Sequence, residues 1–242
     1  MLLAFSHYHF FMSDRFYTSQ PLSLGDVSLD GDEAKHLAIV RRFGAGDRVV
    51  LFNGDGKEYP ATVIEAGKRH VLLRVESVDS PNCERPFPLT VAAAIPKGDR
   101  CDFLIEKLVE LGATRFIPLV AERSVVIPKL DKCKKWERAV IEASKQCGRN
   151  VLMKIDYPCL WDALLQRFGV PHARYVLHTG PNLTPLTPAN DAVSVAIGPE
   201  GGLTEREIAE AIDAGWQLRS LGPRILRIET AAIAAAICVN YL

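Results

Sequence analysis

The sequence predicts a small β domain followed by a larger α/β domain with a mostly parallel sheet, and three observations support this prediction. Short apolar runs separated by turn signals fill residues 15–78. A stretch with three prolines and no periodicity follows at 80–88. After it, apolar strands alternate with amphipathic helices up to the C-terminus. We therefore place the two domains at 14–79 and 89–242, with a linker at 80–88 between them.

The first domain is predicted to be a small β-barrel made from antiparallel hairpins. One short helix is expected over 32–43, ahead of the hairpins. Strands are then expected at 49–52, 58–64 and 71–78, with Asn53-Gly-Asp-Gly as the turn between the first two. Several short strands of this kind need a closed or covered sheet to bury their apolar face, which favours a barrel.

The second domain is predicted to alternate strands and helices along its whole length. Strands are expected at 89–95, 114–120, near Ile155, at 174–178, 193–197 and 216–221. Helices are expected at 99–111, 132–147, 160–168, from Thr204 to a stop at Gly215, and from the polar stretch 224–230 to Leu242. Thr204-Glu-Arg-Glu is a capping-box sequence, which marks the start of the fourth helix. This order is typical of a parallel sheet whose ligands bind at the carboxyl ends of its strands.

The last two predicted strands each end in a Gly-Pro turn. Ile197 leads into Gly-Pro-Glu-Gly-Gly, and Leu221 leads into Gly-Pro-Arg-Ile-Leu-Arg. Neither turn is a dinucleotide fingerprint or a phosphate-binding P-loop, because neither contains G-x-G-x-x-G or G-K-[ST]. Glycines allow close approach and prolines fix the backbone, so such turns can present N–H and C=O groups to a flat ligand such as a purine. The residues leave two readings open, a ligand site and a pair of purely structural turns.

Composition limits the classes of function. Lysine plus arginine number 29, as do aspartate plus glutamate, but a neutral total still permits a local basic face for nucleic acid. No run of about eighteen apolar residues is present, so no membrane span is expected. The six cysteines show no C-x-x-C pair, which predicts reduced thiols in the cytoplasm and no metal site. Residues 1–13 lack the marks of a secretory signal and are expected to form a mobile extension.

The two Gly-Pro segments, Ile197-Gly-Pro-Glu-Gly-Gly-Leu-Thr and Leu221-Gly-Pro-Arg-Ile-Leu-Arg-Ile-Glu-Thr-Ala, resemble the signature of a known family. That family is the bacterial 16S ribosomal RNA uridine-N3 methyltransferases, the RsmE family of the SPOUT superfamily. Ala94-Ile-Pro-Lys-Gly-Asp-Arg and Glu142-Ala-Ser-Lys-Gln-Cys-Gly-Arg-Asn resemble the same family in the same order. The resemblance implies a PUA-like β-barrel that binds RNA, then a trefoil-knotted α/β SPOUT methyltransferase domain. It also implies S-adenosyl-L-methionine as cofactor and a homodimer.

The resemblance implies roles for residues of the second domain. Cofactor contacts are expected from the loops at the strand ends: His178, Thr179, Gly180, Ile197, Gly198, Pro199, Glu200, Gly201, Gly202, Leu221, Gly222, Ile225, Leu226, Arg227, Thr230 and Ala231. Uridine N3 must lose a proton, which needs a base or cations that stabilise the resulting anion. We expect Arg224 and Arg227 to stabilise this anion, and Glu229 to orient an arginine or accept a cofactor amine. No side chain is identified as the base.

The expected partner is 16S ribosomal RNA of the small ribosomal subunit, and no membrane or DNA partner is expected. RNA contacts are expected from Arg41, Arg42, Lys68 and Arg69 in the first domain and from Lys97, Arg100, Arg123, Gln146, Arg149 and Asn150 in the second. Two other functions stay open. One is methylation of a ribose 2′-hydroxyl by a SPOUT enzyme, and the other is a non-catalytic role in RNA binding or ribosome assembly. The methylated atom distinguishes the first alternative, and binding of S-adenosylmethionine distinguishes the second.

Overall fold

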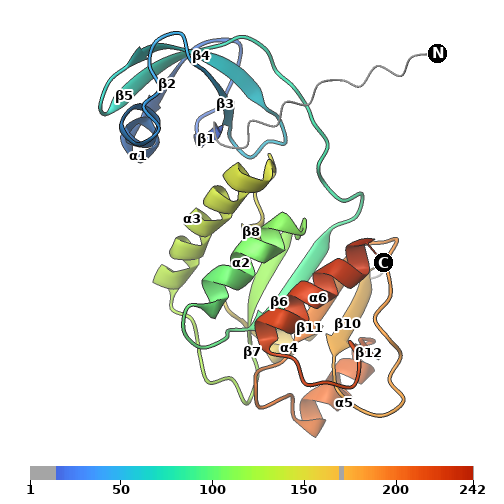
Figure 1. Ribbon diagram of the computed structural model, residues 1–242. Helices are drawn as coiled ribbons and strands as arrows, with labels where there is room; N and C mark the ends of the chain where they lie inside the picture. The colour runs from blue at the N-terminus through green and yellow to red at the C-terminus, as the bar shows by residue number, and fades with distance from the viewer. Residues whose placement is uncertain (1–14, 169–171, 242) are drawn as a thin grey trace, which may run out of the picture. The chain divides into compact units, whose positions relative to one another are not determined.

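The computed structural model describes residues 15–168 and 172–241 and divides into two compact units (Figure 1). The first unit comprises Met1–Asn82 and Lys145–Val151, and the second comprises Cys83–Ser144 and Leu152–Leu242. The division after Asn82 falls inside the Pro-rich stretch at 80–88. The assignment of Lys145–Val151 to the first unit has no counterpart in the sequence prediction, which kept this segment in the second domain. The extension expected at 1–13 lies outside the described residues.

The first unit is built on a five-stranded sheet with the strand order β1-β3-β4-β5-β2. Its strands are β1 (Arg15–Tyr17), β2 (Gly25–Asp30), β3 (Arg48–Phe52), β4 (Tyr59–Ala66) and β5 (His70–Val75). The pairs β3/β4, β4/β5 and β2/β5 are antiparallel, and β1 pairs parallel with β3. The three strands predicted as hairpins are therefore confirmed. The strands β1 and β2 were not predicted, because β1 is very short and β2 carries the polar sequence Gly-Asp-Val-Ser-Leu-Asp.

A short helical segment closes the core of the first unit. It consists of α1 (Gly31–Lys35) followed by one turn of π-helix, η1 (His36–Val40), where a single helix was predicted. Ala34 and Leu37 from this segment pack with Phe16 and with the buried alternate residues of β4, which include Val63. The sheet is thus half of a barrel whose open side is covered by a helix, as a sheet with one apolar face requires.

A buried polar network holds the segment Lys145–Val151 in the first unit. The Arg15 guanidinium donates hydrogen bonds to the Glu58 carboxylate and to the side-chain oxygen of Asn150. The Lys145 ammonium lies 2.8 Å from Glu33 Oε1. Buried charges of this kind are stable only when they are paired, so each partner needs the other in place. The sequence could not reveal this network, because its members are far apart along the chain.

Arg42 has a left-handed backbone, with φ of 62°. It follows η1, where the Phe43 N–H donates to the Leu37 carbonyl at 3.1 Å and so closes the helical segment. Glycine is the usual residue at such a position, since a side chain there costs about 1–3 kcal/mol. Among the residues that the structure describes, only Asn182 shares this combination of a side chain and a positive φ.

We expect the substitution Arg42→Gly to raise the free energy of unfolding by about 1 kcal/mol, because it removes this strain. The greater freedom of glycine in the unfolded chain offsets part of the gain. Urea denaturation measures the change. Arg41→Gly is the matched control, because Arg41 is also exposed but has an ordinary φ of −84° and should lose stability on the same change. Equal effects of the two substitutions would refute the strain argument.

The second unit contains a parallel sheet with the strand order β12-β10-β11-β6-β7-β8, and β9 also pairs with β7. The strands are β6 (Leu89–Ala94), β7 (Arg115–Val120), β8 (Lys154–Ile155), β9 (Cys159–Leu160), β10 (Ala173–Leu177), β11 (Val193–Ile197) and β12 (Gln217–Arg219). Every pairing in this sheet is parallel, where a mostly parallel sheet was predicted. All residues of β6 and β11 are buried, as expected for central strands with both faces covered.

Helices cover both faces of this sheet. They are α2 (Arg100–Glu110), α3 (Leu130–Cys147), α4 (Trp161–Leu165), α5 (Glu205–Asp213) and α6 (Ile228–Tyr241). Figure 1 shows α2 and α6 side by side on one face, where α6 also contacts β6 and β11. On the other face α4 and α5 contribute to a core that includes Trp161 and Trp216. The capping box predicted for α5 is confirmed at Thr204 and Glu207.

Candidate functional site

A cavity of about 450 Å³ opens at the carboxyl ends of β10, β11 and β12, where parallel sheets bind their ligands. Its lining comes from the three loops after these strands and from the start of α6: Leu177, His178, Thr179, Ile197, Gly198, Pro199, Glu200, Gly201, Gly202, Leu203, Leu221, Gly222, Arg224, Ile225, Leu226, Arg227, Ile228 and Ala231. All of the residues predicted to contact a cofactor line the cavity except Gly180 and Thr230. Gly180 lines a neighbouring hollow that shares Leu221 and Gly222 with the cavity.

Glycine is required at particular positions of the two Gly-Pro turns. A Cβ atom on Gly198 would lie 2.9 Å from Leu203 Cγ, so any side chain there would force the buried Leu203 to shift. Gly202 has φ of 72° and donates its N–H to the Pro199 carbonyl at 2.8 Å, which closes the first turn. Gly222 has φ of 106°, a conformation that side chains rarely allow. The glycines therefore fix the backbone that surrounds the cavity.

The second Gly-Pro turn is held by hydrogen bonds from both sides. The Gly222 N–H donates to Ser220 Oγ at 3.0 Å, and the Ser220 N–H donates to the Thr184 carbonyl at 3.0 Å. The His178 N–H donates to the Arg219 carbonyl at 2.9 Å, which joins the loop after β10 to the end of β12. These bonds place two of the three cavity loops in a fixed relation before any ligand arrives.

Glu207 ties the loop after β7 to the loop after β11. Its side chain is only 1% exposed. One carboxylate oxygen completes the capping box with Thr204, and the other accepts the Glu122 N–H at 2.8 Å. Arg123, in the same β7 loop, donates to the Gly201 carbonyl at 2.9 Å. The capping-box sequence revealed only the first of these roles for Glu207, because the partner loop is distant in the chain.

Arg100 connects three elements beside the cavity. Its Nη1 lies 3.4 Å from Glu229 Oε1 at the start of α6, and its Nη2 lies 3.8 Å from Glu200 Oε1 in the first Gly-Pro turn. Its Nε donates to the Lys97 carbonyl at 3.1 Å. Glu229 is buried, and its Oε2 has no hydrogen-bond partner among the residues described. Of the two roles predicted for Glu229, the geometry matches the orientation of an arginine, and that arginine is Arg100.

The mouth of the cavity carries two arginines and one exposed apolar side chain. Arg224 and Arg227 are exposed and line the cavity. Neither makes an ion pair within residues 15–168 and 172–241. Ile225, which lies between them in the chain, is 88% exposed although it also lines the cavity. The mouth therefore presents positive charge and an apolar surface, which together suit a flat anionic ligand.

The residues predicted to bind RNA do not form one cluster in the first unit. Arg41 and Arg42 follow η1, whereas Lys68 and Arg69 form the exposed turn between β4 and β5. The Gly31 N–H donates to the Arg69 carbonyl at 3.3 Å, which puts that turn at the start of α1. The helical segment between the two pairs is about 15 Å long. Any contact with RNA by both pairs must therefore span the length of this segment.

In the segment at the end of α3, Arg149 and Asn150 are 3% and 4% exposed. Their burial in the first unit leaves Gln146 as the residue of this predicted set that faces solvent. Lys97 and Arg123 are exposed and lie in loops at the strand ends of the second unit, whereas Arg100 is the first residue of α2. RNA contact by any of these residues stays a prediction.

Among the described residues no cysteine lines the cavity, and the thiols elsewhere in the domain are poor candidates for a nucleophile. All six cysteines are free, and burial raises the pKa of the Cys101 thiol to about 12. Burial also raises the pKa of Cys238, which lines the neighbouring hollow. These thiols are therefore protonated near neutrality and are poor nucleophiles. Within the described part of the chain no group of three or more metal-binding side chains occurs, and no helix is long and apolar enough to cross a membrane.

Comparison with protein families matches both units. Residues 83–240 match the family described as RNA methyltransferase domain, and residues 29–76 match the RNA methyltransferase PUA domain. Ribosomal RNA small subunit methyltransferase E of Bacillus subtilis is 32% identical to the chain over 230 residues, covering 88% of this chain and 89% of the relative. The protein of the same name from Mycobacterium tuberculosis is 33% identical over 239 residues, covering 94% and 91%.

Solved structures show the same similarity. A ribosomal RNA small subunit methyltransferase E from Neisseria gonorrhoeae, bound to S-adenosyl methionine, superimposes with a TM-score of 0.86 at 32% identity, covering 92% of this chain and 94% of that one. A protein of Legionella pneumophila, solved with bound S-adenosyl methionine, has a TM-score of 0.83 at 34% identity, covering 93% and 95%. The arrangement of a PUA-like half-barrel before a SPOUT-type methyltransferase domain is thus confirmed.

Proposed function

The chain belongs to the ribosomal RNA small subunit methyltransferase E family, and from this premise we propose that it methylates N3 of a uridine in 16S ribosomal RNA with S-adenosyl-L-methionine as the methyl donor. One observation carries the proposal: a cavity walled by two Gly-Pro turns has two arginines without ion pairs, within the described residues, at its mouth. The cavity would hold the methyl donor, and the positive charge of the arginines would stabilise the uridine that accepts the methyl group.

The cavity fits S-adenosylmethionine. Its volume of about 450 Å³ lies within the range of small-molecule sites, roughly 300–1,000 Å³. Gly222 has a positive φ that favours glycine, and a Cβ atom on Gly198 would press on Leu203, so both turns beside the cavity depend on glycine. We expect the backbones of 197–202 and 221–226 to hold the adenosyl group, with Leu226 and Ala231 as apolar walls. When bound, this cofactor supplies a methyl group activated by its sulfonium.

The residues of the chain then have two tasks. Methyl transfer is an in-line displacement, so the loops must hold the N3 lone pair in line with the methyl carbon. Uridine N3 must also lose its proton, and Arg224 and Arg227 would stabilise the negative charge that develops on O2 and O4. The exposed Ile225 would contact the base that leaves the RNA stack to enter the mouth, since an apolar side chain suits an unstacked base.

In this proposal Arg100 and Glu229 act indirectly, through the loops that form the cavity. Glu229 holds Arg100, which in turn lies against Glu200 of the first Gly-Pro turn. The carboxylate of Glu229 also sits in the first turn of α6, where the helix dipole favours a negative charge. We therefore assign Glu229 and Arg100 to positioning of the cavity loops.

Nucleoside mass spectrometry of 16S ribosomal RNA tests the proposed function. The purified protein is incubated with S-adenosylmethionine and with RNA or small subunits from cells that lack the modification. We expect 3-methyluridine as the single new nucleoside. A 2′-O-methylated nucleotide would support the ribose methyltransferase instead. The absence of both methylation and calorimetric binding of S-adenosylmethionine would support a non-catalytic RNA-binding protein.

We also propose that the protein is a homodimer that acts in the cytoplasm, and that its α/β domain carries the trefoil knot implied by the resemblance. Support for the dimer comes from the accessible side of α6, which carries mostly small or apolar side chains. Thr230 and Ile237 are exposed, and Ile233, Ala234 and Cys238 are half-buried along the same side. Such a side permits close packing of a second helix. Light scattering at micromolar concentration should give the mass of a dimer, and a monomer mass would refute this part.

A further inference from the structure

The first half of α3 carries positive charge that the proposed site does not use. Residues 129–138 include five basic and two acidic residues, a net charge of +3 in a chain whose total is zero. All five basic side chains are exposed: Lys129, Lys132, Lys134, Lys135 and Arg138. Lys135 Nζ lies 2.5 Å from Asp102 Oδ2 and so already has a partner. We define the other four, Lys129, Lys132, Lys134 and Arg138, as the α3 basic surface.

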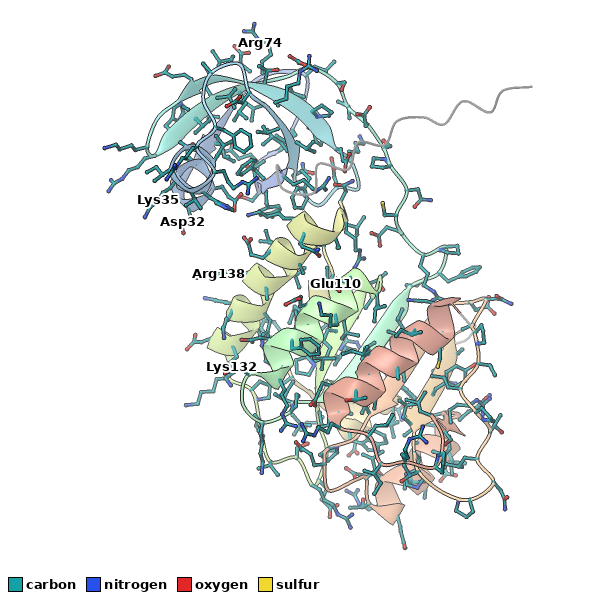
Figure 2. The ribbon with its side chains drawn as sticks, viewed as in Figure 1. Asp32, Lys35, Arg74, Glu110, Lys132 and Arg138 are labelled. Carbon is teal, nitrogen blue, oxygen red and sulfur yellow. The ribbon has the colours of Figure 1, made fainter. Side chains whose placement is uncertain are left out.

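The α3 basic surface has no charge partners of its own. None of its four side chains forms an ion pair with another residue in the described ranges. Figure 2 shows Lys132 and Arg138 extending outward from α3. A solvated charged face usually mixes both signs at helical spacing, and here Lys134 and Arg138, at i and i+4, repel each other. The surface is therefore open to a partner.

The stability of the helix does not explain these charges. The amino end of a helix is the positive end of its dipole, so lysines at that end are unfavourable. Asp131 is the one acidic residue in the first turn of α3, against three lysines within the first six residues. The dipole therefore opposes these lysines, and Lys134 and Arg138 repel each other, while Asp131 and Glu137, each three residues from Lys134, offset part of this repulsion. An anionic partner would turn both effects into stabilisation of the complex.

A loop joins the α3 basic surface to Arg123, which contacts the first Gly-Pro turn of the cavity. The loop 121–129 joins the carboxyl end of β7 to α3, and Figure 1 shows α3 starting from this loop. Arg123 in this loop donates to the Gly201 carbonyl of the first Gly-Pro turn at 2.9 Å. Ser124 Oγ accepts the Ala121 N–H at 2.9 Å, which keeps the loop compact. Lys129 is six residues beyond Arg123, so at most about 20 Å of chain separates these two positive charges.

We propose that the α3 basic surface binds the phosphate backbone of the RNA strand that flanks the target uridine. This inference rests on the proposed function, because an RNA substrate places phosphates beyond the cavity on either side of the reacting base. Lysine and arginine side chains contact phosphates without reading sequence, and such contacts fix the position of the strand. The surface would therefore set the register in which a uridine reaches the cavity, while the cavity loops select the base.

Salt dependence of RNA binding tests the inference. The test variant is Lys132→Gln/Lys134→Gln/Arg138→Gln, and the matched control is Lys132→Arg/Lys134→Arg/Arg138→Lys, which keeps the three charges at the same sites. Each lost phosphate contact lowers the slope of log K against log salt by about 0.7 on single-stranded RNA. We expect the test variant to lose about two units of slope on 16S ribosomal RNA. The control should keep the slope of the unaltered protein.

A full slope in the test variant would overturn the inference. A slope lost equally in the control would also overturn it, because charge would then not be the cause. Calorimetry measures the affinity for S-adenosylmethionine in the same variants, and this affinity should stay unchanged. A lower affinity in the test variant would mean that the substitutions disturb the fold of the domain, and this result would refute surface binding. The proposed function is refuted by a different result: the unaltered protein methylates another atom or no atom. The comparison of salt slopes remains valid in that case, because it measures RNA binding and not methylation.

Discussion

The substitution Gly222→Val should weaken S-adenosylmethionine binding at least tenfold. Gly222 lines the cavity and has φ of 106°, where a side chain costs about 1–3 kcal/mol. Valine, which is branched at Cβ, fits this conformation worse than most residues. The turn would relax away from the cavity, and binding would have to restore it, so the strain would appear as lost affinity. Each 1.4 kcal/mol corresponds to a tenfold change in the dissociation constant. Calorimetry on the purified variant measures this constant.

Gly25→Val is the matched control. Gly25 has φ of 108°, and a Cβ atom there would meet no atom within 4 Å, as at Gly222. Both substitutions should therefore cost similar stability, which thermal unfolding reports. Gly25 lies in β2 of the first unit, so its replacement should leave cofactor affinity unchanged. If Gly222→Val bound the cofactor as the unaltered protein does, the second Gly-Pro turn would have no part in cofactor binding. If both variants lost affinity equally, the effect would be one of overall stability.

Local signals predicted most of the second unit. Alternation of strands and helices, the capping box at Thr204 and the two Gly-Pro turns depend on residues that are neighbours in the chain. The fully buried runs 89–94 and 193–197 could be assigned to central strands for the same reason. The predicted β12 was longer than the observed Gln217–Arg219, because an edge strand has fewer partners to extend it. The cavity followed from the rule that parallel sheets bind ligands at their carboxyl edge.

Contacts between distant residues were beyond the reach of the sequence. The pairing of Arg100 with Glu229 joins residues 129 positions apart. The hydrogen bond between Arg15 and Asn150 joins residues 135 positions apart and draws the end of α3 into the first unit. A helix end with the sequence Gly-Arg-Asn gives the same local signal whether it faces solvent or a second domain. Family resemblance suggested RNA contact there, and only the fold shows that Arg149 is buried.

The glycine-rich turn as a whole predicted the cavity, but the sequence could not identify which of its glycines is essential. The sequence Gly-Pro-Glu-Gly-Gly does not tell which glycine is indispensable. The structure distinguishes them, because a Cβ atom on Gly201 would meet Arg123 Cβ at 3.4 Å, an ordinary contact, whereas one on Gly198 would clash with Leu203. Gly202 needs its positive φ. The demand for glycine thus comes from the close approach of Leu203 at one position and from backbone conformation at the other.

Arg227→Ala should lower the rate of methyl transfer by about 10²–10³, the usual loss when one donor to a developing anion is removed. Arg227 lies at the mouth of the cavity, is exposed, and has no ion pair among the residues described. The negative charge on uridine forms only during the reaction, so its stabilisation affects turnover and not ground-state binding. Affinity for RNA and for S-adenosylmethionine should therefore change little. The fold should tolerate the change, because the Arg227 carbonyl, which accepts the Ala231 N–H at 2.8 Å, is kept.

Single-turnover rates at saturating RNA and S-adenosylmethionine measure this effect, and calorimetry measures cofactor affinity in parallel. Arg227→Lys is the conservative control, because it keeps the charge and loses the planar fork of donors, so it should recover part of the rate. Arg206→Ala is the control for loss of a positive charge, since Arg206 pairs with Glu122 and Glu210 outside the cavity lining and should turn over normally. A normal rate for Arg227→Ala would end its catalytic role. A normal rate with weakened S-adenosylmethionine binding would make Arg227 a cofactor contact, and the anion would then depend on Arg224.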